Sequence, residues 1–414
     1  MIFKLAWKNI SSRPLSTGLS IVLLSSSIMV IVLATLTINQ MKLKFNDNAN
    51  KIDLVIGAKG SRLQLVLCNV FHIDYPTGNI FMEDVEFLTK HPFVRNAVPI
   101  SLGDAYQQHR IIGTNKNFIS EIYNATLEKG ELFNKSSEVV IGSNVAKKLN
   151  LGNSFIGSHG VGESLHEHED FKYLVVGVLK PTGEIIDELI ITPLESIWNV
   201  HHDEYKKGSF DLKTAEEHDL HQLEDEAEHS SHKKEITALL VNYNSPRAKF
   251  SIPGIINKKN SLMSADPAIE IKQLIDLIQP AVNILYFLAL FIFGLSFFSI
   301  IITLVNSMKD RKYEIVMMRV GGASMKIIFI SVILEGFYIG FLGSIIGLVL
   351  GHSLMEIMAS FINFKYHYKF SGLVFDQFEI VLILITILIG MIAAIFPAIV
   401  AYKFDIAKVL KNKI

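Results

Sequence analysis

The sequence predicts a membrane protein with four transmembrane α-helices and a large α+β extracytoplasmic (periplasmic) domain between spans one and two. Three observations support this fold class. Half of the 414 residues are hydrophobic and 19% are charged, which is apolar for a soluble protein but too charged for a chain that lies wholly in lipid. Four long runs are almost free of charge, and a long segment of mixed composition separates the first two. Basic residues flank the runs in the pattern of a protein with both termini inside.

The N-terminal part predicts two helices. Residues 1–13 place apolar and basic side chains on opposite faces, as in an amphipathic helix that lies along the cytoplasmic interface. Residues 14–41 carry no charge before Lys42 and are long enough to cross a hydrocarbon core of roughly 30 Å. The run lacks a small-residue cleavage site, so we expect a retained first span.

Residues 42–276 predict an α+β domain with its own core, because alternating strands, turns and acidic stretches cannot lie in lipid. Buried strands are expected at 53–56, 139–141 and 173–179, and a helix at 143–149.

The C-terminal part predicts the other three spans. They are expected at 281–308, 327–351 and 380–402, with a short external loop at 352–377. Four lysines lie in the tail, residues 403–414, which favours a cytoplasmic C-terminus and a multi-pass protein of the cytoplasmic (inner) membrane.

A charged coupling segment, 309–326, connects the second and third runs. It predicts a short amphipathic helix that Gly321 and Gly322 end. The positive-inside rule alone would explain its charges, but it would not require the amphipathic pattern or the two glycines. We therefore expect a cytoplasmic partner to bind this segment and move the two spans it joins, through the residues Lys309, Arg311, Glu314, Ile315, Met318, Arg319 and Gly322.

The third span contains five glycines at steps of three and four residues. Small residues at this spacing let helix backbones approach closely in lipid, where packing drives association. We expect this stripe to make a close helix contact within the subunit or across a dimer, through Gly336, Gly340, Gly343, Gly347 and Gly351.

Glu335 lies in the same span, where an isolated carboxylate is costly. One interpretation is a proton or cation relay, and the other is a carboxylate that is paired with a neighbouring helix or reached by water. We favour pairing, because no further ionisable residue inside the other spans continues a relay.

Most of the 14 histidines fall in an acidic stretch, and we expect an insertion at about 157–233. Imidazoles three residues apart on a helix, with carboxylates nearby, suit zinc, copper or nickel. A solvated acidic insertion is the alternative interpretation. The candidate ligands of an exchangeable zinc ion are His166, His168, His201, His202, His218, His221, His229 and His232.

Other functional classes are excluded or disfavoured. A net charge of −1 argues against nucleic acid as a partner. The single cysteine, Cys68, excludes an intrachain disulfide and a multi-thiolate metal site. There is no phosphate loop, H-E-x-x-H or G-x-S-x-G motif, so we expect no catalytic residue and no cofactor in this chain.

Several motifs together resemble the FtsX-like permeases of the MacB and LolC/LolE type of ABC transporter. The similar segments are Leu5 to Ile10, Glu138 to Leu149, Val175 to Val178, Arg311 to Ser324 and the tail from Pro397 to Leu410, where Ile406 replaces a usual proline. They cover both ends and the middle of the chain.

This resemblance implies a permease subunit that dimerises, as a homodimer or a heterodimer, and binds two copies of a separate cytoplasmic ABC ATPase. That ATPase would hold ATP and Mg²⁺ and would drive movements of the periplasmic domain, so that a substrate on the outer side, a lipoprotein or a small compound, is exported or extracted. The alternative is a mechanotransmission or sensory protein that regulates a periplasmic hydrolase or a kinase without transport.

Overall fold

The computed structural model describes residues 2–158, 167–200, 234–366 and 370–402. The chain divides into two compact units. The helical unit comprises Met1–Met41, Ile278–Lys365 and Lys369–Ile414, and the sheet domain comprises Lys42–Leu277 with Tyr366–Tyr368.

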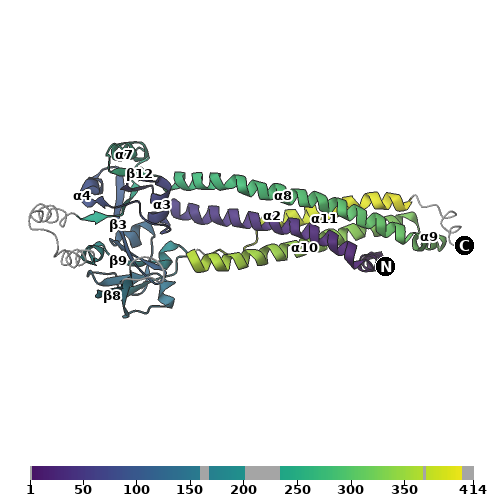
Figure 1. Cartoon of the computed structure of the whole chain (residues 1–414), viewed down its shortest axis with the longest axis horizontal. Coiled ribbons are helices and arrows are strands. Elements are labelled where there is room, and N and C mark those ends of the chain that lie inside the picture. The colour runs from purple at the N-terminus through teal and green to yellow at the C-terminus, as the bar shows by residue number, and fades with distance from the viewer. Residues whose placement is uncertain (1, 159–166, 201–233, 367–369, 403–414) are drawn as a thin grey trace, which may run out of the picture. The chain divides into compact units, whose positions relative to one another are not determined.

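The helical unit is a bundle of long helices that run side by side (Figure 1). Four of its helices are long and apolar enough to cross a membrane, which confirms the predicted number of spans. The helices are α1 (Ile2–Ser11), α2 (Pro14–Ala49), α8 (Pro267–Asp310), α9 (Lys312–Val320), α10 (Met325–Tyr366) and α11 (Gln377–Tyr402).

The helices extend beyond the runs that hydropathy marks. Helix α2 continues past residue 41 to Ala49, and α8 begins at Pro267, before residue 281. The predicted loop 352–377 is wrong over its first part, because α10 remains helical to Tyr366. Hydropathy reports the length that lies in lipid, whereas backbone hydrogen bonding continues through polar residues. A helix of 44 residues such as α8 is about 66 Å long, roughly twice the hydrocarbon thickness.

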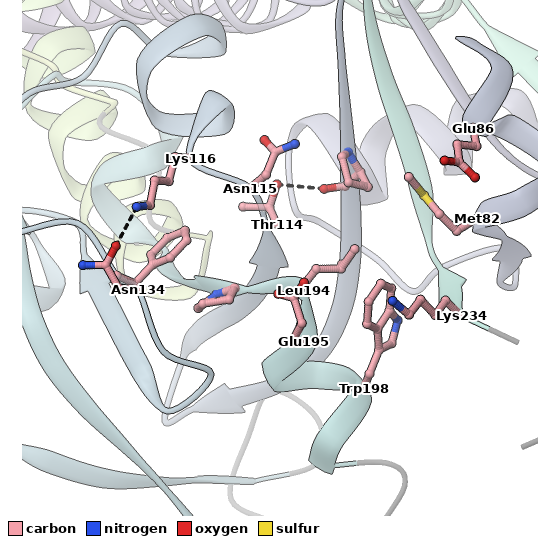
Figure 2. A pocket seen from close by; sticks show the side chains of 13 residues that line it. Met82, Glu86, Thr114, Asn115, Lys116, Asn134, Leu194, Glu195, Trp198 and Lys234 are labelled. Atoms are coloured by element: carbon pink, nitrogen blue, oxygen red, sulfur yellow. Dashed lines mark hydrogen bonds between the residues drawn. The ribbon is translucent and has the colours of Figure 1, made fainter. Parts of the chain in front are cut away.

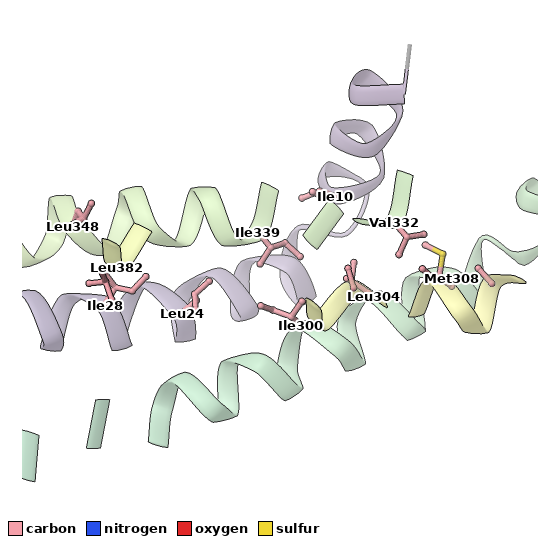
Figure 3. Close-up of a cluster of buried hydrophobic side chains, with 14 of the residues drawn as sticks. Ile10, Leu24, Ile28, Ile300, Leu304, Met308, Val332, Ile339, Leu348 and Leu382 are labelled. Atoms are coloured by element: carbon pink, nitrogen blue, oxygen red, sulfur yellow. The ribbon is translucent and has the colours of Figure 1, made fainter. Parts of the chain in front are cut away.

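Aliphatic side chains from all four spans form the core of the bundle. Leu24 and Ile28 of α2 lie among residues from α8, α10 and α11 (Figure 3). Hydroxyl groups supplement this packing: Ser20 Oγ lies 2.9 Å from Ser299 Oγ, and Ser27 Oγ donates to the carbonyl oxygen of Ala289 at 2.7 Å. Such contacts hold α2 against α8 in lipid, where the hydrophobic effect between helices is weak.

The sheet domain contains a ten-stranded mixed sheet with the order β12-β1-β11-β3-β4-β9-β6-β8-β5, and β7 pairs with β3 and β8. The β4–β9 and β6–β8 pairs are parallel, and the other pairs are antiparallel. Strands β10 and β2 form a separate pair. The strands are β1 (Leu54–Ala58), β2 (Ile80–Phe81), β3 (Val94–Tyr106), β4 (His109–Thr114), β5 (Leu127–Gly130), β6 (Glu138–Ile141), β7 (Ser154–Ser158), β8 (Glu167–Leu179), β9 (Ile190–Pro193), β10 (Glu235–Ile236), β11 (Ala238–Tyr243) and β12 (Leu262–Ala265).

Two hydrophobic cores lie along this sheet. The first packs β1, β11 and β12 against α7 (Ala248–Ile256), and the second lies among β4, β6, β8 and β9. Strand β3 serves both, because Val94 and Ala97 pack against the first core and Tyr106 against the second. Short helices complete the domain: α3 (Arg62–Val70), α4 (Met82–Val85), η1 (Glu86–Lys90), η2 (Phe118–Ile122), η3 (Val145–Lys147) and η4 (Ile185–Glu188).

The strands predicted at 53–56, 139–141 and 173–179 are confirmed as β1, β6 and β8. The helix predicted at 143–149 is wrong, since this segment forms only a single 3-10 turn, η3. The bounds of the His- and acid-rich insertion predicted at about 157–233 are too wide. Strands β8 and β9 lie within that range and are interior strands of the sheet. The strand at 173–179 was predicted within this range, but β9 was not.

Candidate functional site

Helix α9 connects two of the long helices. Arg311 interrupts the helical path between α8 and α9, with φ −90° and ψ 12°. At the other end of α9, the Gly321 amide donates to the carbonyl oxygen of Met317, and the Ala323 amide donates to that of Met318. Gly322 between them has φ +93°, a left-handed conformation that favours glycine. The predicted amphipathic helix, with glycines at its end, is therefore confirmed.

The two faces of α9 differ in polarity and exposure. Ile315 and Val316 are buried, and Ile315 belongs to the bundle core, against which Met318 also packs. Tyr313 and Met317 are on the exposed side, 39% and 48% exposed. An exposed patch that mixes aromatic, thioether and charged groups is suited to contact with another protein.

Glu335, Arg311 and Asn9 form a polar cluster, which we call the Glu335 cluster. Nη2 of Arg311 donates to both carboxylate oxygens of Glu335, at 3.0 and 3.1 Å. The side-chain amide of Asn9 donates to Oε1 of Glu335 at 2.7 Å. Glu335 is 1% exposed, and these contacts join α1, the α8–α9 connection and α10.

The Glu335 cluster decides between the relay and the paired carboxylate as interpretations of Glu335. A buried carboxylate inside a span is costly unless it is paired and hydrogen-bonded, and Glu335 has both an ion pair and an amide donor. The paired interpretation is therefore confirmed. Nearby, Arg13 forms an ion pair with Asp310, which gives the N-terminal region a second link to the end of α8.

The structure divides the seven predicted coupling residues into two groups. Lys309, Glu314 and Gly322 are exposed, and Arg319 is half-buried. The other three, Arg311, Ile315 and Met318, face the bundle. Sequence reasoning missed Asn9 and Arg13, because it placed α1 along the lipid interface and had no signal for its contacts with the bundle.

The glycine stripe contacts two different helices. A Cβ at Gly336 would collide with the carbonyl oxygen of Gly390 on α11. A Cβ at Gly347 would lie 2.7 Å from Cβ of Ile28 and 2.8 Å from the carbonyl oxygen of Ser25 on α2. Both are closer than ordinary van der Waals contact. Gly340 faces α11 in the same way, and Gly343 and Gly351 face α2.

The predicted zinc ligands lie almost entirely outside the described residues. Seven of the eight candidate histidines lie outside the described residues, and for the eighth, His168, only the backbone of β8 is described. Within the described ranges, no group of three or more metal-ligating side chains comes together. Zinc binding by the histidines remains a prediction.

The sheet domain also contains an open cleft of about 530 Å³ (Figure 2). Its lining includes the apolar side chains of Met82 on α4 and Leu194, together with the charged residues Glu86, Lys116, Glu195 and Lys234. Trp198 lies beside Lys234, whose Nζ is 4.9 Å from the centroid of the indole ring. Sequence analysis did not predict this cleft, because its lining comes from several segments far apart in the chain.

Two family profiles match the sequence. Residues 286–406 match the FtsX-like permease C-terminal family, and residues 17–230 match the MacB-like periplasmic core domain. The second match alone spans more than half of the chain. A comparison with curated proteins gave no match.

Among solved structures, the chain is similar to the periplasmic region of MacB from Actinobacillus actinomycetemcomitans, with 14% identity and a TM-score of 0.34, over 56% of this chain and 98% of that one. It is also similar to the extracellular domain of the noncanonic ABC-type transporter YknZ from Gram-positive bacteria, with 14% identity and a TM-score of 0.29, over 51% and 98%. From the profile matches, the chain belongs to the FtsX-like ABC transporter permeases that carry a MacB-like periplasmic core domain.

Proposed function

We propose that this chain is the permease subunit that converts ATP hydrolysis on a separate ABC ATPase into movements of its MacB-like domain. The observation that carries the proposal is the construction of α9. One face carries exposed side chains such as Met317, while the other face is packed into the core of the bundle. A partner that displaces α9 therefore also displaces buried groups.

The Glu335 cluster passes the movement of α9 to the long helices. Arg311 lies at the α8–α9 connection, and its charge-assisted bonds to Glu335 resist separation of that connection from α10. Asn9 adds α1 to the same unit. Closure of two ATPase copies against α9 would then move α8 and α10 together.

The interior of the bundle favours movement over conduction. Among the described residues of the helical unit, Glu335 and Glu379 are the buried carboxylates, and Glu379 is near the start of α11. The other buried polar side chains among the described residues of the helical unit are mainly serines and threonines. A hydrophilic path usually needs more polar or ionisable groups than this. The proposed substrate, a lipoprotein or a small compound, would therefore be handled by the MacB-like domain outside the bilayer.

The exposed face of α9 gives the test. The full chain, purified from its native host, should co-purify with an ABC ATPase that mass spectrometry identifies. Met317→Asp places a charge in the centre of the exposed face and should reduce ATPase recovery at least tenfold, because a desolvated charge without a partner is costly at an interface. Ser360→Asp, on the exposed surface of α10 at the other end of that helix, is the matched control and should leave recovery unchanged. Equal recovery with Met317→Asp would place the ATPase contact elsewhere.

A second variant separates binding from transmission. Glu335→Gln keeps the size of the side chain but removes its charge, so the ATPase should still bind while the permease-dependent increase in its turnover falls. Loss of binding together with turnover would contradict a transmitting role for the Glu335 cluster.

A further inference from the structure

Residues 370–376, which lead into α11, are held by polar contacts from α2 and α10. Gln40 of α2 exchanges two hydrogen bonds with the backbone of Ser371, at 2.7 and 3.0 Å. Glu356 of α10 accepts from the Gly372 amide at 2.6 Å. His352, one turn earlier, places Nδ1 2.5 Å from the carbonyl oxygen of Gly372.

The start of α11 is fixed in the same network. His352 Nε2 lies 3.0 Å from Oε2 of Glu379, and the side-chain amide of Asn39 donates to Asp376 at 2.8 Å. A Cβ at Gly372 would collide with the backbone of His352, so the loop lies directly on α10. We call these contacts the loop cluster.

The loop cluster turns three consecutive apolar side chains outward. Leu373, Val374 and Phe375, the loop tip, are 83%, 49% and 68% exposed. The Phe375 ring stacks on the imidazole of His352, with 5.1 Å between centroids. A loop that uses this many polar contacts to present leucine, valine and phenylalanine is unfavourable in water, because exposed apolar surface costs about 25 cal/mol per Å².

We propose that the loop tip inserts into the lipid leaflet on the side of the membrane opposite α9. The first argument is continuity of surface. After Asp376 and the exposed Gln377, the first turns of α11 present four exposed apolar side chains: Phe378, Ile380, Val381 and Leu384. The tip is thus the end of the lipid-facing surface of a span.

The second argument is depth. His352 lies 27 residues after Met325, the first residue of α10 (352 − 325), which corresponds to about 40 Å along the helix. A bilayer with its headgroups is about 40–45 Å thick. The His352 ring and the loop tip stacked on it are therefore at the level of the headgroups, where aromatic and aliphatic side chains enter the leaflet. Neither argument depends on the proposed coupling to an ATPase.

Site-directed spin labelling of the full chain in lipid nanodiscs tests the insertion. The label is attached to Leu373→Cys, and its collisions with oxygen, which partitions into lipid, are compared with its collisions with an aqueous nickel chelate. The native Cys68 does not interfere, because it is buried and burial raises the pKa of its thiol to about 11. Two positions calibrate the measurement. Leu384→Cys lies on the lipid-facing side of α11, and Ser360→Cys is exposed about 12 Å further along α10 than His352.

At position 373 we expect oxygen collisions to exceed nickel collisions severalfold, as at position 384, with the reverse at position 360. Val374→Cys should give the same result and serves if Leu373→Cys fails to fold. A tip that behaves like position 360 is in water, and a tip protected from both reagents is covered by protein, such as a second copy of this chain. Either result overturns the proposal.

Discussion

Two buried ionisable residues, one in each unit, have opposite electrostatic surroundings. Glu335 in the bundle is 1% exposed and receives three hydrogen bonds from Arg311 and Asn9. His72 in the sheet domain is 8% exposed, and the charge that acts on it, Arg110, is positive and disfavours a protonated ring.

The difference follows from what each group can do without a partner. The partners of Glu335 are suited to an ionised carboxylate, because Arg311 brings a compensating positive charge. An imidazole can remain neutral instead. Burial, and then the positive charge of Arg110, lower the pKa of His72 from its ordinary value of 6.5 to about 3. One site therefore keeps a charge by pairing it, and the other avoids the charge.

Removing one partner of the Glu335 cluster should have the largest effect. Arg311→Ala leaves a buried carboxylate without its cation, which costs about 3–5 kcal/mol. The thermal unfolding midpoint of the full chain in detergent should fall by many degrees. Replacing both members, Arg311→Met with Glu335→Met, should restore most of the loss, because no charge is then buried. The exposed Lys309→Ala is the control. A double variant as unstable as Arg311→Ala would mean that the ion pair is not the origin of the effect.

Moving the helix that carries Glu335 should have the next largest effect. Gly336→Leu forces α10 away from α11, since even a Cβ there meets the Gly390 backbone. Overpacking of this kind costs about 1–3 kcal/mol, and a clash with backbone favours the upper end. The thermal midpoint measures the loss. Gly294→Leu on α8 is the matched control, because nothing lies within 4 Å of a Cβ at that position in the described structure. Equal midpoints for the two variants would show that the α10–α11 contact is not close.

The sequence predicted the features that depend on local pattern. Four apolar runs gave the four spans, and the apolar and basic spacing with Gly322 gave helix α9 and its end. Glycines at helical spacing identified a packing surface on α10, but their partners on α2 and α11 could not be assigned from one helix alone.

Features that join distant segments were not predictable from the sequence. Asn9 lies 326 residues from Glu335, and an asparagine on a short helix at a membrane surface is ordinarily solvated. The continuation of α10 to Tyr366 was missed for another reason: its polar residues ended the hydropathy signal although the backbone stayed helical. The loop cluster was missed with it, since His352 and Glu356 were placed in a loop rather than on one face of a helix.

Acidification should test the other member of the comparison. The pKa of His72 is lower in the folded chain than its ordinary value of 6.5, so the unfolded chain binds the extra proton. The stability of the folded state therefore decreases as the pH is lowered from about 6.5 to about 3. From pH 7 to pH 5 the folded state should lose about 2 kcal/mol, measured as the shift of a denaturant midpoint monitored by Trp198 fluorescence in the full chain carrying Trp7→Phe. His72→Asn is the comparison variant, because it cannot titrate in this range and asparagine tolerates the φ of +54° at this position. The difference between wild type and variant should therefore change by about 2 kcal/mol over this pH range. Parallel pH profiles would show that His72 accepts its proton in the folded state at no cost.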